Sequence, residues 1–218
     1  MVQPKNMTTR RLREQNKQRN FEHIKQAAKR LFEQKGYEET TTREIAEAAE
    51  IGTGTLFLYV KDKAELLILV YADALAEVTT HAFSTLPEDM SLLDALIHIF
   101  SSFFHFYEQH PANARHFLKE LLFHSGDSKG YQSFAPINED LIGRLAQLIR
   151  RAQERGEIRE DVEPRLAAAS FFAMYFAAVT AWLGSFLHTE AVTPDELRIV
   201  FDLQIKGMLP AGKRGSNE

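Results

Sequence analysis

The chain has 218 residues, of which 44% are hydrophobic and 26% are charged, and it contains no cysteine. These values are ordinary for a soluble globular protein, and they exclude a disulfide framework and a thiolate metal site. The first residues contain no apolar run of the kind that a secretory signal needs, so we expect a cytoplasmic protein.

The net charge of −4 hides an asymmetry between the two parts of the chain. Residues 1–66 hold 13 Lys and Arg against 10 Asp and Glu, which leaves 13 against 20 for residues 67–218. A basic N-terminal part on an acidic body indicates that one end meets a polyanion, although an exposed charged tail would give the same balance.

Residues 1–20 form the first segment, and they are strongly basic. They carry Lys5, Arg10, Arg11, Arg13, Lys17 and Arg19 against the single acid Glu14. We expect an arm here that either reaches an adjacent minor groove of DNA or remains a solvated tail.

Three short helical patterns follow over residues 21–60. Apolar residues recur at spacings of three and four from Phe21, and Gly36 ends that helix. Thr41 and Glu44 form a capping-box pattern that opens the second helix, and glycines at 52 and 54 precede the third. Two short helices joined by a tight turn are typical of a DNA-binding helix-turn-helix, but a purely structural helical subdomain has the same outline.

Asp62 and Glu65 form a second capping-box pair, which opens a long helix extending to about residue 78.

The residues of this region closely resemble the DNA-binding domain of the TetR family. The resemblance covers residues 27–46 and 54–66, and its motifs are Gly36-Tyr37, Thr40-Thr41-Thr42, Ile45-Ala46, Gly54-Thr55-Leu56-Phe57 and Lys63-x-x-Leu66. It implies a DNA-binding domain over residues 21–66 with the helix-turn-helix at about 41–60. Glu50 departs from the family pattern, because a turn glycine is common there. Gly52 stands in place of the usual serine cap, and Val60 in place of a phenylalanine.

The resemblance assigns eight residues to DNA. Base edges are expected to meet Thr53, Gly54, Thr55 and Phe57, since threonine methyls and a phenylalanine edge can contact thymine methyls. Phosphates are expected to meet Thr42, Arg43, Tyr59 and Lys63. Lys63 lies in the first turn of its helix, where a cation opposes the helix dipole, so an external anion would account for it. Ile45, Leu56 and Leu58 are expected to hold the helices together.

Further helices are predicted for the C-terminal part, residues 67–210. They span about 91–109, 112–124 and 137–155, with a loop at 125–130, then a helix with Pro164 in its first turn and a last helix at 193–208. Residues 211–218 are expected to be a disordered tail. The predicted fold class is all-α: an N-terminal three-helix helix-turn-helix domain plus a helical ligand-binding and dimerisation domain.

Residues 166–187 contain no charge and are long enough to span a bilayer. We favour a helix buried inside a soluble protein, because the segment is only mildly apolar and no second one of its kind is evident. The resemblance implies that this helix and the last one pair across a two-fold axis, giving a homodimer through residues 164–208 without a membrane contact. A two-fold dimer in turn implies a palindromic operator.

Aromatic residues are concentrated in two of the predicted helices, where the resemblance places an inducer pocket. The candidate ligand-binding residues are His98, Phe100, Phe104, His105, Phe172, Tyr175 and Phe176. A filled aromatic core would show the same spacing. Two histidine sets, Asp94/His98/His105 and His116/Glu120/His124, have metal-compatible spacing, but exposed histidines on polar faces are commoner, and we expect neither metal nor cofactor.

The sequence therefore predicts a transcription regulator, a repressor released from its operator by a small, mostly apolar inducer. Two alternatives remain: a helical DNA-binding protein that acts architecturally or through a protein partner without an inducer, and a helical enzyme or binding module with no DNA role. We find neither a nucleophile elbow nor a phosphate-binding glycine loop, so an enzyme is not expected.

Overall fold

A computed structural model describes residues 5–123, 129–184 and 194–209, and all the regular elements in these ranges are helices. They are α1 (Lys5–Lys35), α2 (Thr42–Ala48), α3 (Thr53–Leu56), α4 (Lys63–Ser84), α5 (Leu92–Gln109), α6 (Pro111–Phe123), α7 (Lys129–Glu154), α8 (Pro164–Leu183) and α9 (Pro194–Gly207). The expected all-α fold class is confirmed.

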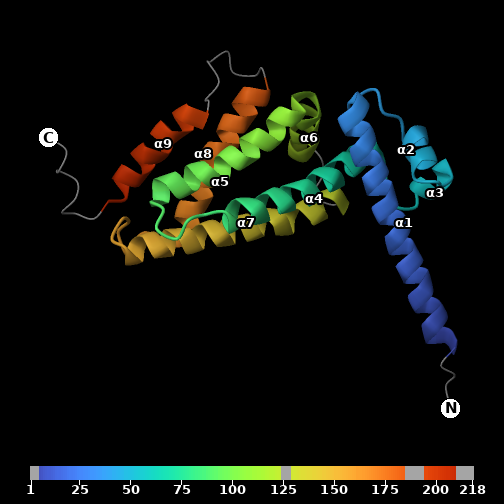
Figure 1. Cartoon of the computed structure of the whole chain (residues 1–218), viewed down its shortest axis with the longest axis horizontal. Coiled ribbons are helices and arrows are strands. Elements are labelled where there is room, and N and C mark those ends of the chain that lie inside the picture. Colours follow the sequence, from blue (N-terminus) through green and yellow to red (C-terminus); the bar gives the residue numbers. More distant parts are fainter. Residues whose placement is uncertain (1–4, 124–128, 185–193, 210–218) are drawn as a thin grey trace.

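The helices form two groups that α4 connects (Figure 1). At one end α1 packs against α2 and α4, and α2 packs against α3. In the other group α7 lies between α4 and α8, while α5 contacts both α4 and α9. Because α4 packs against α1 as well as α5, α6 and α7, it is a direct physical connection between the two groups.

Local hydrogen bonds fix the helix starts, mostly as the sequence predicts. The Thr41 hydroxyl accepts a bond from the Glu44 amide, and the Glu44 carboxylate accepts one from the Thr41 amide, which completes the capping box. The Asp62 carboxylate accepts from the amide of Glu65. The Glu65 carboxylate differs from the expected box, since it accepts from the Lys61 amide at 2.6 Å. Pro164 occupies the first turn of α8, as expected.

Two helices start earlier than the sequence pattern indicates. The first begins at Lys5 instead of Phe21, so residues 5–20 are helical; extending an existing helix avoids the cost of nucleation. The second, α7, begins at Lys129 instead of residue 137 and contains Pro136. This proline is exposed, while Phe134 packs its ring 5.9 Å from that of Phe117, so burial of the aromatic residue favours the longer helix.

The start of α7 crosses α4 closely. A β-carbon at Gly130 would lie 3.0 Å from the β-carbon of Ile68, which is closer than a side chain tolerates. Of the predicted loop 125–130, residues 125–128 lie outside the described residues, as do residues 185–187 of the uncharged run, the predicted cap Thr193 and the tail 211–218.

The expectation of a single apolar segment of membrane-spanning length is wrong. Both α4 and α8 have the length and hydropathy of a membrane span. Most of α4 is buried within the bundle, as expected for the core helix of a globular protein, whereas less than half of α8 is covered. The uncovered side of α8 therefore needs a separate explanation.

Candidate nucleic-acid interface and ligand cavity

The helix-turn-helix is built from α2, a tight turn and α3. Ile45, Ala46 and Leu56 are fully buried between the helices. Glu50 in the turn has φ +57°, a left-handed backbone conformation that costs a non-glycine residue about 1–2 kcal/mol. The turn thus keeps the geometry that glycine usually provides, and Glu50 occupies it under strain.

The recognition helix α3 is short, and it continues as tighter turns. The amides of Leu58 and Tyr59 bond the carbonyls three residues earlier, at 3.1 and 2.9 Å. A side chain at Gly54 would meet no atom within 4 Å, so the protein itself leaves this space open. Thr53 and Thr55 are half-buried, and the Phe57 side chain is exposed. These candidates share one accessible end of the domain.

Leu58 was expected in the core, and this expectation is wrong. It is 75% exposed, because the tighter turn after Leu56 rotates it to the surface beside Phe57. Tyr59 is half-buried, and its ring stacks on Phe21 of α1 at 6.0 Å between centroids. The stacking fixes the end of the recognition helix against α1.

Lys63 has hydrogen-bond partners inside the protein. An external phosphate was expected to explain a cation at this helix start, and these partners explain it instead. Its ammonium donates to the carbonyl oxygens of Tyr37, Glu38 and Thr40 at 2.7, 3.2 and 2.9 Å. It also lies 4.2 Å from the centroid of the Tyr37 ring. Burial lowers the pKa of Lys63. Because three carbonyls occupy its three donors, no external anion is needed to explain a cation at this helix start.

Arg43 is the best exposed of the candidate phosphate ligands. Its side chain is 81% exposed and pairs with Glu47 one turn later, at 2.9 Å. Neighbouring Thr42 is half-buried. Glu44 accepts from Lys35 and Thr41, and these bonds lower its pKa to about 2. A surface pair such as Arg43–Glu47 is weak, so Arg43 remains available to a stronger anion.

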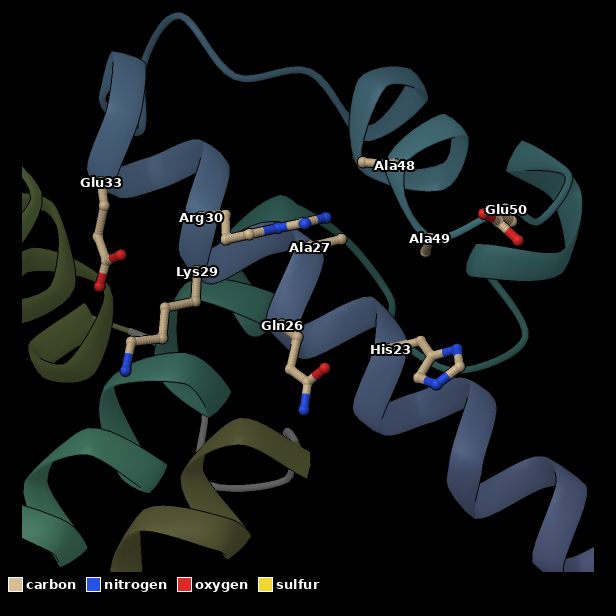
Figure 2. Close-up of a pocket in the computed structure, with 9 residues that line it drawn as sticks. All are labelled: His23, Gln26, Ala27, Lys29, Arg30, Glu33, Ala48, Ala49 and Glu50. Atoms are coloured by element: carbon tan, nitrogen blue, oxygen red, sulfur yellow. The ribbon is translucent and has the colours of Figure 1, made fainter.

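An open concavity of about 460 Å³ separates α1 from the turn after α2 (Figure 2). Figure 2 shows Lys29, Arg30 and Glu33 on its α1 side and Glu50 on the opposite wall. The charges of these two cations and two anions cancel. No lining residue has a buried polar atom that lacks a hydrogen-bond partner. The concavity therefore has the character of a solvent-filled groove.

A smaller cavity, of about 220 Å³, lies inside the bundle between α4, α5, α6, α7 and α8. It is lined by Leu75, Thr79, Phe103, Tyr107, Leu118, Leu121, Tyr131, Phe134, Ala135, Ile137, Asn138, Glu139, Leu141, Phe172, Tyr175 and Phe176. Three of these, Phe172, Tyr175 and Phe176, were candidates from the sequence. A mostly apolar cavity with few polar groups is typical of a small-molecule site.

Four other candidates do not line the cavity. Phe100 stacks on Tyr175 at 4.5 Å and Phe104 packs edge-on to it at 5.6 Å, so both support the wall from behind. His98 and His105 point to the opposite side of α5, where they border an open groove next to α4. At 100° per residue, Phe103 and Tyr107 belong to the inward stripe of α5, and the histidines seven residues apart belong to the outward one.

The outward histidines have ordinary surface partners. The Nε2 atom of His98 lies 2.9 Å from the Thr85 hydroxyl, and His105 lies 3.7 Å from Glu108. His116 pairs with Glu38 at 3.1 Å, and His124 lies outside the described residues. Within the described ranges no three His, Asp or Glu side chains are close enough to hold a metal ion.

Two polar atoms at the cavity have no hydrogen-bond partner among the described residues. They are the hydroxyl of Tyr175 and the Oδ1 atom of Asn138, both buried. Burial raises the pKa of Tyr175, and also that of neighbouring Tyr107. The two hydroxyls therefore remain protonated, and the Tyr175 hydroxyl offers an unused donor inside an apolar space.

The first turns of α6 connect the bundle to the N-terminal helices. The buried Asn113 side chain bonds the backbone at the end of α1, donating to Phe32 and accepting from Tyr37. His116 packs its ring 4.9 Å from that of Tyr37. Burial raises the pKa of Tyr37 to about 12. Since α6 also contributes Leu118 to the cavity, one helix contacts both the cavity and the end of α1 in the DNA-binding domain.

A largely apolar face is exposed along α8 and α9, with Glu196 and Lys206 at its two ends on α9. Its large apolar members are Leu166, Ile199 and Leu203, and small residues Ala169, Ala173 and Ala177 are exposed between them on α8. The Gln204 side chain donates to the Ser170 hydroxyl at 3.1 Å and holds the two helices together. Small residues at a spacing of four allow a second helix to approach closely.

Comparisons with known proteins agree with this division of the chain. Residues 24–70 match the family model described as "Bacterial regulatory proteins, tetR family", and residues 93–198 match "Tetracyclin repressor-like, C-terminal domain". The fatty acid metabolism regulator protein of Bacillus subtilis is 22% identical over 77% of this chain and 85% of its own length. The transcriptional regulator AcrR of Shigella flexneri is 26% identical over 78% and 80%.

Solved structures share the whole architecture. Thermus thermophilus FadR, determined in complex with lauroyl-CoA, superposes with a TM-score of 0.70 at 23% identity, covering 91% of this chain and all of that one. Bacillus subtilis FadR, in complex with stearoyl-CoA, superposes with a TM-score of 0.63 at 21% identity, covering 86% and 99%.

Proposed function

This chain belongs to the TetR family of bacterial regulatory proteins, and from that premise we propose that it is a repressor released from a palindromic operator by a small, mostly apolar ligand. It is a DNA-binding transcription regulator and not an enzyme. The observation that carries the proposal is the presence, in one chain, of a helix-turn-helix and an internal apolar cavity joined by α6. We place the protein in the cytoplasm, where its operator would be.

On the DNA side, the exposed end of the recognition helix is the reading surface. We assign base-edge contacts to Thr53, Gly54, Thr55 and Phe57, and we add the exposed Leu58, whose methyl groups could meet a thymine methyl. Phosphate contacts go to Thr42, Arg43 and Tyr59. The open space at Gly54 supports this assignment, because a base edge could approach the backbone there.

The N-terminal extension of α1 forms a basic helical arm, residues 5–20. Arg11, Lys17 and Arg19 are exposed, and Glu14 is the only acid of the segment. A helix is wider than the minor groove of B-DNA, which is about 6 Å across, so a helical arm suits phosphate contact better than groove insertion. We assign the arm to the sugar–phosphate backbone that flanks the half-site.

On the ligand side, the cavity is suited to a single hydrocarbon chain. Its lining is mostly Leu, Phe and Ile, and its volume of about 220 Å³ is below that of most drug-sized ligand pockets. Two structural neighbours are described in complex with fatty acyl-CoA esters. We therefore propose a fatty acyl thioester as the ligand class.

A homodimer through α8 and α9 completes the proposal. The exposed, largely apolar face that includes Leu166, Ile199 and Leu203 would be buried against its two-fold copy. Two recognition helices at a fixed separation then read two half-sites, and a ligand that changes this separation lowers the operator affinity.

The test uses the full-length protein and the DNA upstream of its own gene. Fluorescence anisotropy at several salt concentrations should show tighter binding to one promoter fragment than to random DNA of equal length. Lauroyl-CoA should release the fragment, while free coenzyme A should not. Equal affinity for promoter and random DNA would contradict specific operator binding. Specific binding that no acyl-CoA affects would instead favour a regulator acting through a protein partner.

A further inference from the structure

The hydroxyl group of Tyr175 is an unusual feature of the cavity wall. Tyr175 is 3% exposed, and its hydroxyl has no hydrogen-bond partner among the described residues. A buried hydroxyl without a partner destabilises the folded protein, whereas phenylalanine in the same place would carry no such cost. Its presence is explained if a ligand completes the hydrogen bond.

The ring of Tyr175 is held in place from several sides. Phe100 stacks on it at 4.5 Å, and Phe103 and Phe104 pack against it at 5.8 and 5.6 Å. The neighbouring Tyr107 hydroxyl is near enough for a weak hydrogen-bonding interaction that contributes to the pKa shifts of both tyrosines, but the pair does not have the geometry of a normal hydrogen bond. The hydroxyl is therefore fixed at the cavity and cannot turn to solvent.

Asn138 of α7 supplies a second polar group to the same cavity. Its Oδ1 atom is buried without a partner, and the residue lines the cavity together with Tyr175 of α8. Turning the amide by 180° about its last bond would exchange the oxygen for the NH₂ group, so Asn138 can act as acceptor or donor. The cavity thus combines two neutral hydrogen-bonding groups with an apolar lining.

The cavity has no positive charge to offer a ligand. Its described lining contains no Lys, Arg or His, and the only ionised residue is Glu139, which is paired with Arg165. A free carboxylate in the cavity would therefore be buried without a counter-charge. An uncharged carbonyl avoids that penalty and still accepts a hydrogen bond, although a weaker one than a carboxylate would accept.

We propose that the Tyr175 hydroxyl donates a hydrogen bond to an uncharged carbonyl oxygen of the ligand, with Asn138 as a second polar contact, so that the cavity selects acyl thioesters or esters over free fatty acids. This inference rests on the proposed function, because it takes the cavity as the ligand site. It adds that the ligand must carry an uncharged carbonyl group and that Tyr175 recognises this group.

The test compares three probes with the same twelve-carbon chain, measured by isothermal titration calorimetry on the full-length protein. Lauroyl-CoA carries the thioester carbonyl, S-dodecyl-CoA is the thioether that lacks it, and laurate carries a charged carboxylate. The wild-type protein should bind lauroyl-CoA about fivefold to tenfold more tightly than the thioether, the ratio typical of one net hydrogen bond. Laurate should bind more weakly still.

Two variants assign the effect to Tyr175. Tyr175→Phe should bind lauroyl-CoA and the thioether with equal affinity, whereas Tyr37→Phe, which lies after α1 and outside the cavity lining, should keep the wild-type ratio. Two results would overturn the inference but not the proposed acyl ligand class. One is equal binding of lauroyl-CoA and the thioether by the wild-type protein, and the other is binding of laurate as tight as that of lauroyl-CoA. If no probe binds the wild-type protein, the inference and the proposed acyl ligand both fail. The wild-type comparisons decide the matter even if Tyr175→Phe does not fold.

Discussion

Asn113 and Phe32 are joined by a 2.6 Å hydrogen bond, from the side-chain amide of one to the main-chain oxygen of the other, across 81 positions in the sequence. The Oδ1 atom of the same side chain accepts from the Tyr37 amide at 2.7 Å. Both backbone groups lie at the end of α1, and Asn113 lies in the first turn of α6. A shift of α6 caused by a ligand in the cavity would therefore pull on the DNA-binding domain through this amide group and through the neighbouring His116 contacts.

Asn113→Ala should weaken that transmission. The substitution leaves the Tyr37 amide without its partner and removes one of two bonds to the Phe32 carbonyl, which keeps the bond from the Gly36 amide. An unsatisfied buried group costs about 1–3 kcal/mol of unfolding free energy. The ratio of operator affinities without and with lauroyl-CoA should fall toward one, measured by anisotropy alongside thermal denaturation. Gln147→Ala, an exposed amide on α7, is the matched control and should change neither quantity. An unchanged ligand response in Asn113→Ala would assign the coupling to another contact.

Lys63 and Arg43 should behave differently when each is neutralised. Lys63→Met keeps the aliphatic stem but loses three carbonyl partners, so we expect a loss of about 1–3 kcal/mol in stability and an unchanged salt dependence of DNA binding. Arg43→Ala should leave stability nearly unchanged and flatten the salt slope by about one unit. A flatter slope in Lys63→Met, with wild-type stability, would restore Lys63 to the phosphate contacts.

Glu50→Gly should stabilise the protein. The left-handed backbone at this position disfavours a side chain, and glycine removes that cost of about 1 kcal/mol, less the entropy that it adds to the unfolded chain. Glu47→Gly, the same substitution within α2, should instead destabilise by about 1 kcal/mol. Thermal denaturation of both variants gives the sign; a loss of stability in Glu50→Gly would show that the Glu50 side chain makes a compensating contact.

Leu203→Glu should dissociate the dimer. Leu203 is 65% exposed on the largely apolar face of α9, and a charge placed there would be buried among apolar side chains at the proposed two-fold contact. Sedimentation equilibrium should show monomer for the variant and dimer for the wild type, with operator affinity lost in parallel. Gln147→Glu, which adds a charge on exposed α7, should remain dimeric. Dimeric Leu203→Glu would place the interface elsewhere.

Features that depend on neighbouring residues were predictable from the sequence. The Thr41–Glu44 box and the first-turn Pro164 each involve groups within one turn, so pattern and structure agree. The partners of Lys63 lie 23 to 26 residues away, and a helix pattern contains no information about them. The dipole argument identified an unusual cation correctly, but the partners that the structure gives it are three neutral carbonyl oxygens instead of an anion.

The candidate cavity was predictable only in part, for a related reason. Aromatic spacing located the helices that enclose it, but the inward stripe of α5 is fixed by how α5 packs against α4 and α8. That packing turns His98 and His105 outward and brings Phe103 and Tyr107 inward. Asn138 gave no signal, because its environment depends on α7 starting at Lys129, before Pro136.

Because α1 is one unbroken helix, a small rotation of the DNA-binding domain would produce a larger displacement at the N-terminal end of this helix. It is 31 residues long, or about 46 Å at 1.5 Å per residue, and Phe21 is its first apolar residue packed against the core. Residues 5–20 extend about 24 Å beyond Phe21, and of these Glu14, Lys17 and Gln18 border an open groove with Leu58 and Tyr59. A tilt of the domain by about 10° would move the N-terminal end of these residues by about 4 Å. This displacement is as long as the N···O distance that a salt bridge allows, about 4 Å. A motion too small to withdraw the recognition helix from its groove would thus already detach this end from the DNA backbone, so the flanking contacts would break first and re-form last.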